Sequence, residues 1–247
     1  MIGIVLAGGR GSRFKSEDGL PKVLYPYNNK PLVQRVFDVV HPYCAQTVVV
    51  VGGQHSDLMR KVFQDYEGIT FIEQENPRGT GHAVLATEEY VAGLLKRGEV
   101  QEDEIMICYG DKPLVDKECF LNLVSALKPG SPRGPEAVLG TSQMGVDSRK
   151  GRILRFDEGG FIGIKEWRDA NEEERKIQEV NAGIYGFHVR SLYPALHEIT
   201  PDNSAGELYL TDVFKILVGH GNRVETFPVD ARSCADINTL DDLAALS

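Results

Sequence analysis

Several patterns that would identify a binding site are missing from this chain of 247 residues. It contains no Gly-Lys dipeptide, which excludes a Walker A phosphate-binding loop. No apolar run approaches the roughly 20 residues that a membrane-spanning helix needs. Its four cysteines form no C-x-x-C pair, so we expect no zinc site and a reducing compartment. They are Cys44, Cys108, Cys119 and Cys234.

Positive charge is also scarce. Lys and Arg number 27 against 36 Asp and Glu, which gives a formal net charge of −9. We therefore expect no general nucleic-acid-binding surface. No basic segment precedes an apolar one at the N-terminus, so we expect no signal peptide and a cytoplasmic protein without a membrane partner. An acidic chain that handles polyphosphates must gather its positive charge locally or use a metal ion, and this favours Mg²⁺ as a cofactor.

The most informative segment is the glycine-rich loop after the first apolar run. Ile2–Leu6 predicts a buried strand, and it leads into Leu6-Ala7-Gly8-Gly9-Arg10-Gly11-Ser12-Arg13-Phe14. Backbone amides at such a turn can hold phosphate oxygens, and Arg13 and Lys22 add positive charge. Phe14 stands where the dinucleotide fingerprint needs its third glycine, so the loop suits a nucleoside triphosphate instead. The alternative is an ordinary strand-to-helix turn.

Short apolar runs alternate with longer amphipathic ones. This order predicts an α/β fold with a doubly wound, mostly parallel sheet and helices on both faces. After residue 141 strands follow one another, which predicts antiparallel additions in a second lobe. The expected strands are Ile2–Leu6, Thr47–Val51, Thr70–Ile72, Glu104–Tyr109, Ala137–Thr141, Ile153–Asp157, Phe161–Lys165, Ile184–His188 and Val224–Phe227. The expected helices are Leu32–Val40, Asp57–Phe63, Gly81–Leu95, Lys117–Leu127, Ser191–His197, Thr211–Val218 and Thr239–Leu246.

Candidate metal ligands lie near the expected carboxyl edge of the sheet, where such folds bind ligands. Asp111 follows the run Ile105–Tyr109 and Gly110, and Mg²⁺ prefers one or two carboxylates together with phosphate oxygens and water. The alternative for Asp111 is to cap a turn. Asn238 precedes the last expected helix and is also a good N-cap candidate, so it joins a metal site only with a partner such as Asp111.

Other polar residues could recognise the organic parts of a substrate. Gln74 and a helix that opens at Gly79 can read a base edge or hold an anion. His82 is better explained as structural, because a phosphate nucleophile is already an anion and needs no general base. Glu166 and Asn181 offer the mixture of carboxylate and amide that sugar hydroxyls need.

Taken in order, segments along nearly the whole chain resemble one known family. They are LAGGRGSRF with PKVL, QENPRGTGHA, YGDKPL, KGRIL, IKEWRDANEEERKIQEVNAGIYGF and NSAGELYLTDV. The first loop is shared by most sugar-nucleotide pyrophosphorylases. The later motifs are closer to the uridyltransferase domain of the bacterial bifunctional N-acetylglucosamine-1-phosphate uridyltransferase/glucosamine-1-phosphate acetyltransferases, which this chain therefore resembles.

The resemblance implies a Rossmann-like nucleotide-diphospho-sugar transferase fold and Mg²⁺-assisted formation of UDP-N-acetylglucosamine and diphosphate. The small-molecule partners implied are UTP and N-acetylglucosamine 1-phosphate. Residues 1–247 are expected to form a single nucleotidyltransferase domain, with a nucleotide-binding half at about 1–141 and a sugar-binding half at about 142–247. No hexapeptide repeats occur before Ser247, so we expect acetyl transfer and the repeat-built trimer to be absent.

The resemblance also assigns roles to individual residues. Arg13, Lys22 and Asp111 are the implied catalytic residues, with Arg13 stabilising charge as diphosphate leaves. The implied substrate-binding residues are Leu6, Ala7, Gly8 and Gly9 on the nucleotide, Lys22 on its phosphates, Gln74, Gly79 and Thr80 on uracil, Tyr109 and Gly110 beside Asp111, and Gly151, Glu166 and Asn181 on the amino sugar. The implied metal ligands are Asp111 and Asn238.

The chain departs from the family at three further places. Ala182 stands where threonine is usual, Lys112 where a small apolar residue is usual, and two extra residues fit between Arg13 and Lys22. The sugar preference and the oligomeric state therefore stay open. One alternative function is a pyrophosphorylase for another sugar 1-phosphate or nucleoside triphosphate. Another is a non-catalytic subunit that senses nucleotide sugars, although Arg13, Lys22 and Asp111 argue against it.

Overall fold

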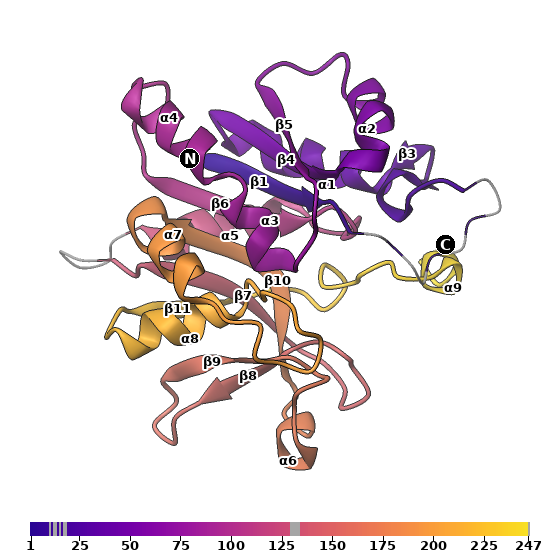
Figure 1. The fold of residues 1–247 in the computed structure, drawn as a ribbon. Helices are drawn as coiled ribbons and strands as arrows, with labels where there is room; N and C mark the ends of the chain where they lie inside the picture. The colour runs from indigo at the N-terminus through magenta and orange to yellow at the C-terminus, as the bar shows by residue number, and fades with distance from the viewer. Residues whose placement is uncertain (10, 12–13, 15, 17–18, 129–133, 247) are drawn as a thin grey trace.

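A mixed sheet forms the centre of the molecule (Figure 1). The computed structural model describes residues 1–9, 11, 14, 16, 19–128 and 134–246. Within them the main strand order is β11-β7-β10-β6-β1-β4-β5, and β8 and β9 extend from β10. The strands are β1 (Ile2–Ala7), β4 (Gln46–Gly52), β5 (Ile69–Gln74), β6 (Glu104–Tyr109), β7 (Ala137–Gln143), β8 (Arg152–Arg155), β9 (Phe161–Lys165), β10 (Glu179–His188) and β11 (Val224–Pro228). A separate short hairpin joins β2 (Pro26–Tyr27) to β3 (Lys30–Pro31).

Helices cover both faces of this sheet, so its strands are apolar on both sides (Figure 1). Ile4 and Ile107 pack on one face with α3 (Thr80–Leu85), α4 (Glu88–Lys96), α7 (Val189–Glu198) and α8 (Asp212–Gly219). Val5 and Cys108 pack on the other with α1 (Leu32–Val40), α2 (Ser56–Val62) and α5 (Lys117–Leu127). No helix in the described part of the chain has the length and hydrophobicity to span a bilayer.

The predicted parallel, doubly wound half is confirmed. β1 is the central strand of this half and pairs in parallel with β4 on one side and β6 on the other. β5 then pairs in parallel with β4. Because these four strands run the same way, their carboxyl ends share one edge, and Leu6 lies directly opposite Tyr109 there. The segments that follow β1 and β6 are therefore neighbours.

The strands after residue 141 are arranged less simply than expected. The β8–β9 hairpin is antiparallel, as predicted, but β10 enters the central sheet antiparallel between β6 and β7. Its pairing with β7 shifts register between Asn181 and Tyr185, which marks a β-bulge. β11 then pairs in parallel with β7. Both halves of the chain thus contribute to one continuous sheet.

The helix expected over Gly81–Leu95 is two helices. Thr87, fully buried between them, donates its hydroxyl to the Val84 carbonyl at 2.6 Å and lies 2.9 Å from the Tyr193 hydroxyl. This local bond competes with the helical ladder, and a new helix begins at Glu88. The short acidic helix α6 (Glu172–Arg175) lies between β9 and β10 in the chain.

Phe214 of α8 anchors the cover over β10. Its ring centroid lies 5.0 Å from that of Phe187 and 5.4 Å from that of Tyr185, and the side chain is fully buried. We expect Phe214→Ala to lower the free energy of unfolding by about 3–5 kcal/mol, because it leaves a cavity. Urea unfolding measures this. The control is Phe156→Ala, at a ring that is 49% exposed, and equal losses in the two variants would contradict the packing.

Candidate functional site

Two cavities open along the carboxyl edge of the parallel strands. The first, which we call the loop cavity, measures about 560 Å³ and lies beneath the glycine-rich loop after β1. The second, the hairpin cavity, measures about 570 Å³ and lies between the β8–β9 hairpin and the bulge of β10. Tyr109, Asp111 and Asn238 line both cavities. Two ligands bound side by side would therefore meet at these three residues.

A lysine joins the two polar residues at this junction. Lys22 comes from the short turn Lys22–Leu24, Asp111 follows β6, and Asn238 precedes α9 (Leu240–Ala244). The Lys22 Nζ lies 2.5 Å from Asp111 Oδ2 and 3.3 Å from Asn238 Oδ1. The Ile237 amide also donates to the Asp111 carbonyl at 3.0 Å, which fixes the two segments to each other.

Asn238 does not cap the last helix. Thr239 takes that position, and its side chain and that of Asp242 form a reciprocal capping box. The cap therefore leaves the Asn238 side chain at the cavity junction, where its Oδ1 accepts from Lys22. The short helix α9 is held in turn by the β2–β3 hairpin, since the Tyr27 hydroxyl donates to the Leu246 carbonyl at 3.0 Å. The short helix α9 thus holds Asn238 beside Lys22, close to the β2–β3 hairpin.

The Asp111–Asn238 pair fits Mg²⁺. Its oxygens are the ligand type that Mg²⁺ prefers, and the bridging ammonium of Lys22 demonstrates that a cation can be placed between them. No group of three or more His, Cys, Asp or Glu side chains suited to a metal exists within the described residues. A magnesium ion held here would accordingly complete its shell with water and substrate phosphate oxygens.

The far wall of the loop cavity is held by local contacts. Gln74, at the end of β5, lies 2.8 Å from His82 Nδ1 and donates to the Gly79 carbonyl at 3.4 Å. Burial lowers the pKa of His82, with a smaller contribution from Arg78, which favours a neutral ring that orients Gln74. The structural interpretation of His82 agrees with these contacts. Gly79 has φ 117°, and a Cβ there would lie 2.5 Å from the Leu208 carbonyl oxygen, so only glycine fits.

The hairpin cavity presents an amide and a carboxyl group. Asn181 accepts from the Gly183 amide at 2.9 Å and donates to the Tyr185 hydroxyl at 2.7 Å, so the bulge fixes its side chain. Glu166 accepts from the Thr211 hydroxyl at 2.9 Å. Burial raises the pKa of Glu166, and the Thr211 hydrogen bond opposes that shift only in part.

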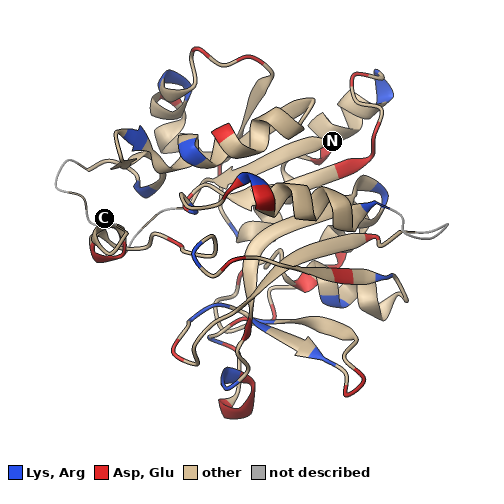
Figure 2. Ribbon diagram, turned by 180° about the vertical axis from the view of Figure 1, so that it is seen from behind, with Lys and Arg blue, Asp and Glu red and all other residues tan. Residues whose placement is uncertain are grey.

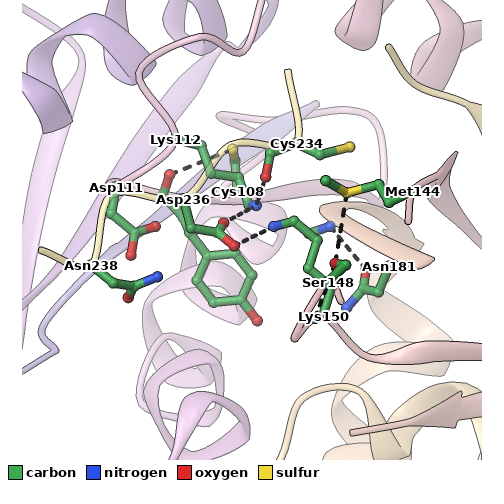
Figure 3. A network of polar contacts seen from close by, with 12 residues as sticks. Cys108, Asp111, Lys112, Met144, Ser148, Lys150, Asn181, Cys234, Asp236 and Asn238 are labelled. Carbon is green, nitrogen blue, oxygen red and sulfur yellow. Dashed lines mark hydrogen bonds and ion pairs between the residues drawn. The ribbon is translucent and has the colours of Figure 1, made fainter. Parts of the chain in front are cut away.

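An ion cluster at the hairpin cavity was not anticipated as a site. Lys112 and Lys150 donate to opposite oxygens of the Asp236 carboxylate, and Lys112 also donates to the Cys234 carbonyl at 3.4 Å (Figure 3). The side chains of Lys112 and Lys150 are only 3% and 12% exposed. Burial alone would raise the pKa of Asp236, but the two ammonium groups outweigh it and hold that pKa at about 2.

Most of the sequence-derived candidates line one of the two cavities. Ala7 and Gly110 line neither, because they pack between β1, β6 and α1. Arg13 lies outside the described residues. Loop-cavity candidates are Leu6, Gly8, Gly9, Lys22, Gln74, Gly79, Thr80, Tyr109, Asp111 and Asn238, and hairpin-cavity candidates are Tyr109, Asp111, Gly151, Glu166, Asn181 and Asn238.

Charged side chains of both signs line the two cavities at this edge. Lys and Arg are otherwise distributed over many elements of the ribbon, with acidic residues gathered on α6 and α9 (Figure 2). Lys22, Lys112 and Lys150 all line the cavities, although the chain as a whole is acidic. Carboxylates line the same cavities, so the positive charge available to a phosphate group is local to these lysines.

Comparison with known proteins identifies the family. A model of the MobA-like NTP transferase domain matches residues 3–210. The chain belongs to this family. The prediction of a nucleotidyltransferase is thereby confirmed at the level of the family, and so is the resemblance drawn from the motifs.

Curated relatives of this NTP transferase domain are longer than the chain itself. It is 33% identical over 244 residues to "Bifunctional protein GlmU" of Syntrophomonas wolfei, which covers 99% of this chain and 51% of that protein. It is 36% identical over 218 residues to the protein of the same name in Bordetella parapertussis, covering 88% and 45%. The chain thus spans about half the length of the curated relatives it matches.

Solved structures support the fold. A "Putative Glucose-1-Phosphate Thymidylyltransferase" from Bacillus anthracis superposes with a TM-score of 0.76 at 20% identity, covering 100% of this chain and 95% of that one. The "inositol-1-phosphate CTP transferase" from T. maritima gives 0.72 at 21% identity, covering 98% and 90%. Both structures are named as nucleotidyltransferases, and their similarity to this chain confirms the predicted nucleotide-diphospho-sugar transferase fold.

The ion cluster should make stability depend on pH. Because the folded-state pKa of Asp236 is depressed, its ionisation stabilises the fold above the unfolded value and ceases to do so as pH falls toward 2. We expect Asp236→Asn to cost about 2 kcal/mol at pH 7 and progressively less below pH ~4. Denaturant unfolding at several pH values measures this. Exposed Asp65→Asn is the control, and a cost independent of pH would contradict the ion cluster.

Proposed function

We propose that this chain transfers a uridylyl group from UTP to N-acetylglucosamine 1-phosphate, forming UDP-N-acetylglucosamine and diphosphate. The observation that carries the proposal is the junction at Asp111 and Asn238, where a cavity beneath a glycine-rich loop meets a second cavity with sugar-type polar groups. A transfer between two substrates needs this arrangement, because the reacting atoms must be brought together. The names of the curated relatives support the same assignment.

On the nucleotide side, each group has a role that fits its place. Gly8 and Gly9 bring backbone amides to the cavity wall, and Lys22 supplies an ammonium for the phosphates. Gln74, with its amide oriented by His82, and Thr80 would contact the uracil edge. Ala7 and Gly110 act indirectly, by allowing the β1 and β6 ends to pack closely.

On the sugar side, the residues suit neutral hydroxyl and acetamido groups. Asn181 is fixed by the bulge of β10, Glu166 is held by Thr211, and Gly151 leaves room beside it. Ala182 is fully buried and is not among the residues that line the hairpin cavity, so its effect on the choice of sugar would be indirect. We propose that the nucleotide-binding half spans about residues 1–141 and the sugar-binding half about 142–247 of a single domain.

The reaction proposed is in-line displacement at the α-phosphorus. The sugar phosphate oxygen attacks from the hairpin cavity, and diphosphate leaves through the loop cavity toward Lys22. Mg²⁺ held by Asp111 and Asn238 would neutralise the phosphate charges when bound. Lys22 and Arg13 would stabilise the negative charge that develops on diphosphate, and no covalent intermediate with a side chain is needed.

A second candidate keeps the chemistry but changes the substrates. The two solved structures are named for thymidylyl and cytidylyl transfer, to glucose 1-phosphate and inositol 1-phosphate, and share this fold. A panel of nucleoside triphosphates against sugar 1-phosphates distinguishes this case. A non-catalytic nucleotide-sugar sensor is disfavoured, because the junction carries Lys22 and Asp111, which binding alone does not require.

The proposed activity is measured by diphosphate release from UTP, Mg²⁺ and N-acetylglucosamine 1-phosphate. We expect turnover by the wild type and a loss of at least about 100-fold in Asp111→Asn, because charge neutralisation at the junction is removed. Asp157→Asn, at an exposed turn, is the matched control. Tight UDP-sugar binding without any diphosphate release would support the sensor instead. Full activity in Asp111→Asn would contradict the assignment of Asp111 as a metal ligand.

Metal binding can be tested without turnover. Lys22 contacts both proposed ligands, so Lys22→Met should raise the affinity of the nucleotide-free protein for Mn²⁺ by about fivefold, whereas Asp111→Asn should abolish binding. Electron paramagnetic resonance of free Mn²⁺ measures both. Lys61→Met, on the exposed face of α2, serves as the control. Shifts in the same direction for Lys22→Met and Asp111→Asn would show that they do not share one cation site.

A further inference from the structure

The Lys112–Asp236–Lys150 cluster is built into the wall of the hairpin cavity. Lys112 follows Asp111 directly in the chain, and Asp236 lies two residues before Asn238. The same two segments therefore supply the junction and the cluster, as Figure 3 shows. Lys150 reaches Asp236 from the loop before β8. The cluster lies between the junction and the sugar-type residues that line the hairpin cavity.

The bulge of β10 makes room for this arrangement. Gly183 has φ 75°, and a Cβ there would lie 2.5 Å from Lys112 Cε and 3.1 Å from Lys112 Nζ. Tyr109 lies beside both residues: its Cδ2 would be 3.1 Å from that Cβ, and its ring centroid is 6.0 Å from Lys112 Nζ. A buried lysine beside a proposed metal ligand is costly unless it is paired, and a small apolar residue would pack here with less difficulty. The free-energy cost of burying Lys112 therefore indicates that its ammonium group has a function in the cavity.

The two lysines of the cluster have more N–H donors than their contacts with Asp236 and Cys234 use. Each ammonium carries three N–H groups. In the described structure Lys112 Nζ donates to Asp236 and to the Cys234 carbonyl, while Lys150 Nζ donates only to Asp236. Asp236 uses both of its oxygens, so it and the two lysines together carry a net charge of about +1 and keep unused N–H groups, in a cavity that Asp111, Glu166 and Asp242 also line. An anion with several oxygens accepts from these groups in hydrogen bonds that are stronger than those to a neutral sugar hydroxyl.

We propose that Lys112 and Lys150, held in place by Asp236, form the binding site for the phosphate of the sugar 1-phosphate. Within the described residues Lys150 Nζ donates to Asp236 alone, so Lys150 has more N–H groups available to a phosphate than Lys112 has. This inference rests on the proposed function and deepens it. It makes Lys150 a determinant of substrate class, because Lys150 recognises the phosphate of a phosphorylated sugar in the hairpin cavity. This recognition does not depend on which sugar ring carries the phosphate.

The test is calorimetric binding in the presence of Mg²⁺ and a non-reacting α,β-methylene analogue of UTP. The ligand is the sugar 1-phosphate that the turnover panel selects, or N-acetylglucosamine 1-phosphate if none is turned over. We expect Lys150→Met to weaken its binding about tenfold or more, through loss of a charge-assisted hydrogen bond. Lys150→Arg should stay within about threefold of the wild type. Binding of the UTP analogue should not change.

Lys150→Met should fold, because Asp236 keeps its pairing with Lys112, and thermal unfolding verifies this. Lys176→Met, at an exposed lysine of similar type, is the control. The proposal is overturned if Lys150→Met binds the sugar 1-phosphate as the wild type does, if it loses the UTP analogue equally, or if the wild type does not bind the sugar 1-phosphate. Lysine-dependent binding without diphosphate release would leave this inference standing and overturn only the proposed reaction.

Discussion

Strand β10 imposes the constraint on which the site depends. It enters the sheet antiparallel beside β6, with Tyr185 opposite Ile107, and so its bulge at Asn181 lies next to the segment that follows Tyr109. A cavity on this side must then share a wall with the cavity beneath the β1 loop, and that wall ends in Asp111. The two-cavity geometry therefore follows from strand order and not from any single binding residue.

Pairing with carboxylates explains how an acidic chain accommodates several lysines at this site. Lys22 is paired with Asp111, and Lys112 and Lys150 share Asp236, so each buried ammonium has a carboxylate that limits its cost. The two groups differ in net charge: Lys22 and Asp111 together are neutral, whereas Lys112, Lys150 and Asp236 together carry a positive charge. The carboxylate partners let the site contain several lysines in a chain whose net charge is −9.

Local patterns predicted the elements well and their neighbours poorly. The bounds of β6 and α5 were predicted correctly because their apolar periodicity is local. The place of β10 was not, because pairing with both β6 and β7 depends on contacts distant in sequence. Asp111 was recognisable as the end of a strand. Lys150 and Asp236 were not, because each is an ordinary charged residue until the fold brings them together across 86 positions.

The central claim is that both substrates meet at one cation site between the cavities. Mn²⁺-induced relaxation of ³¹P nuclei tests it most directly, in a ternary complex of the protein with the α,β-methylene UTP analogue and the sugar 1-phosphate. If the account is right, bound Mn²⁺ broadens the α-phosphorus of the nucleotide and the phosphorus of the sugar together, and Asp111→Asn removes both effects. Relaxation of the nucleotide phosphorus alone, with an unaffected sugar phosphate, would contradict a shared junction at Asp111.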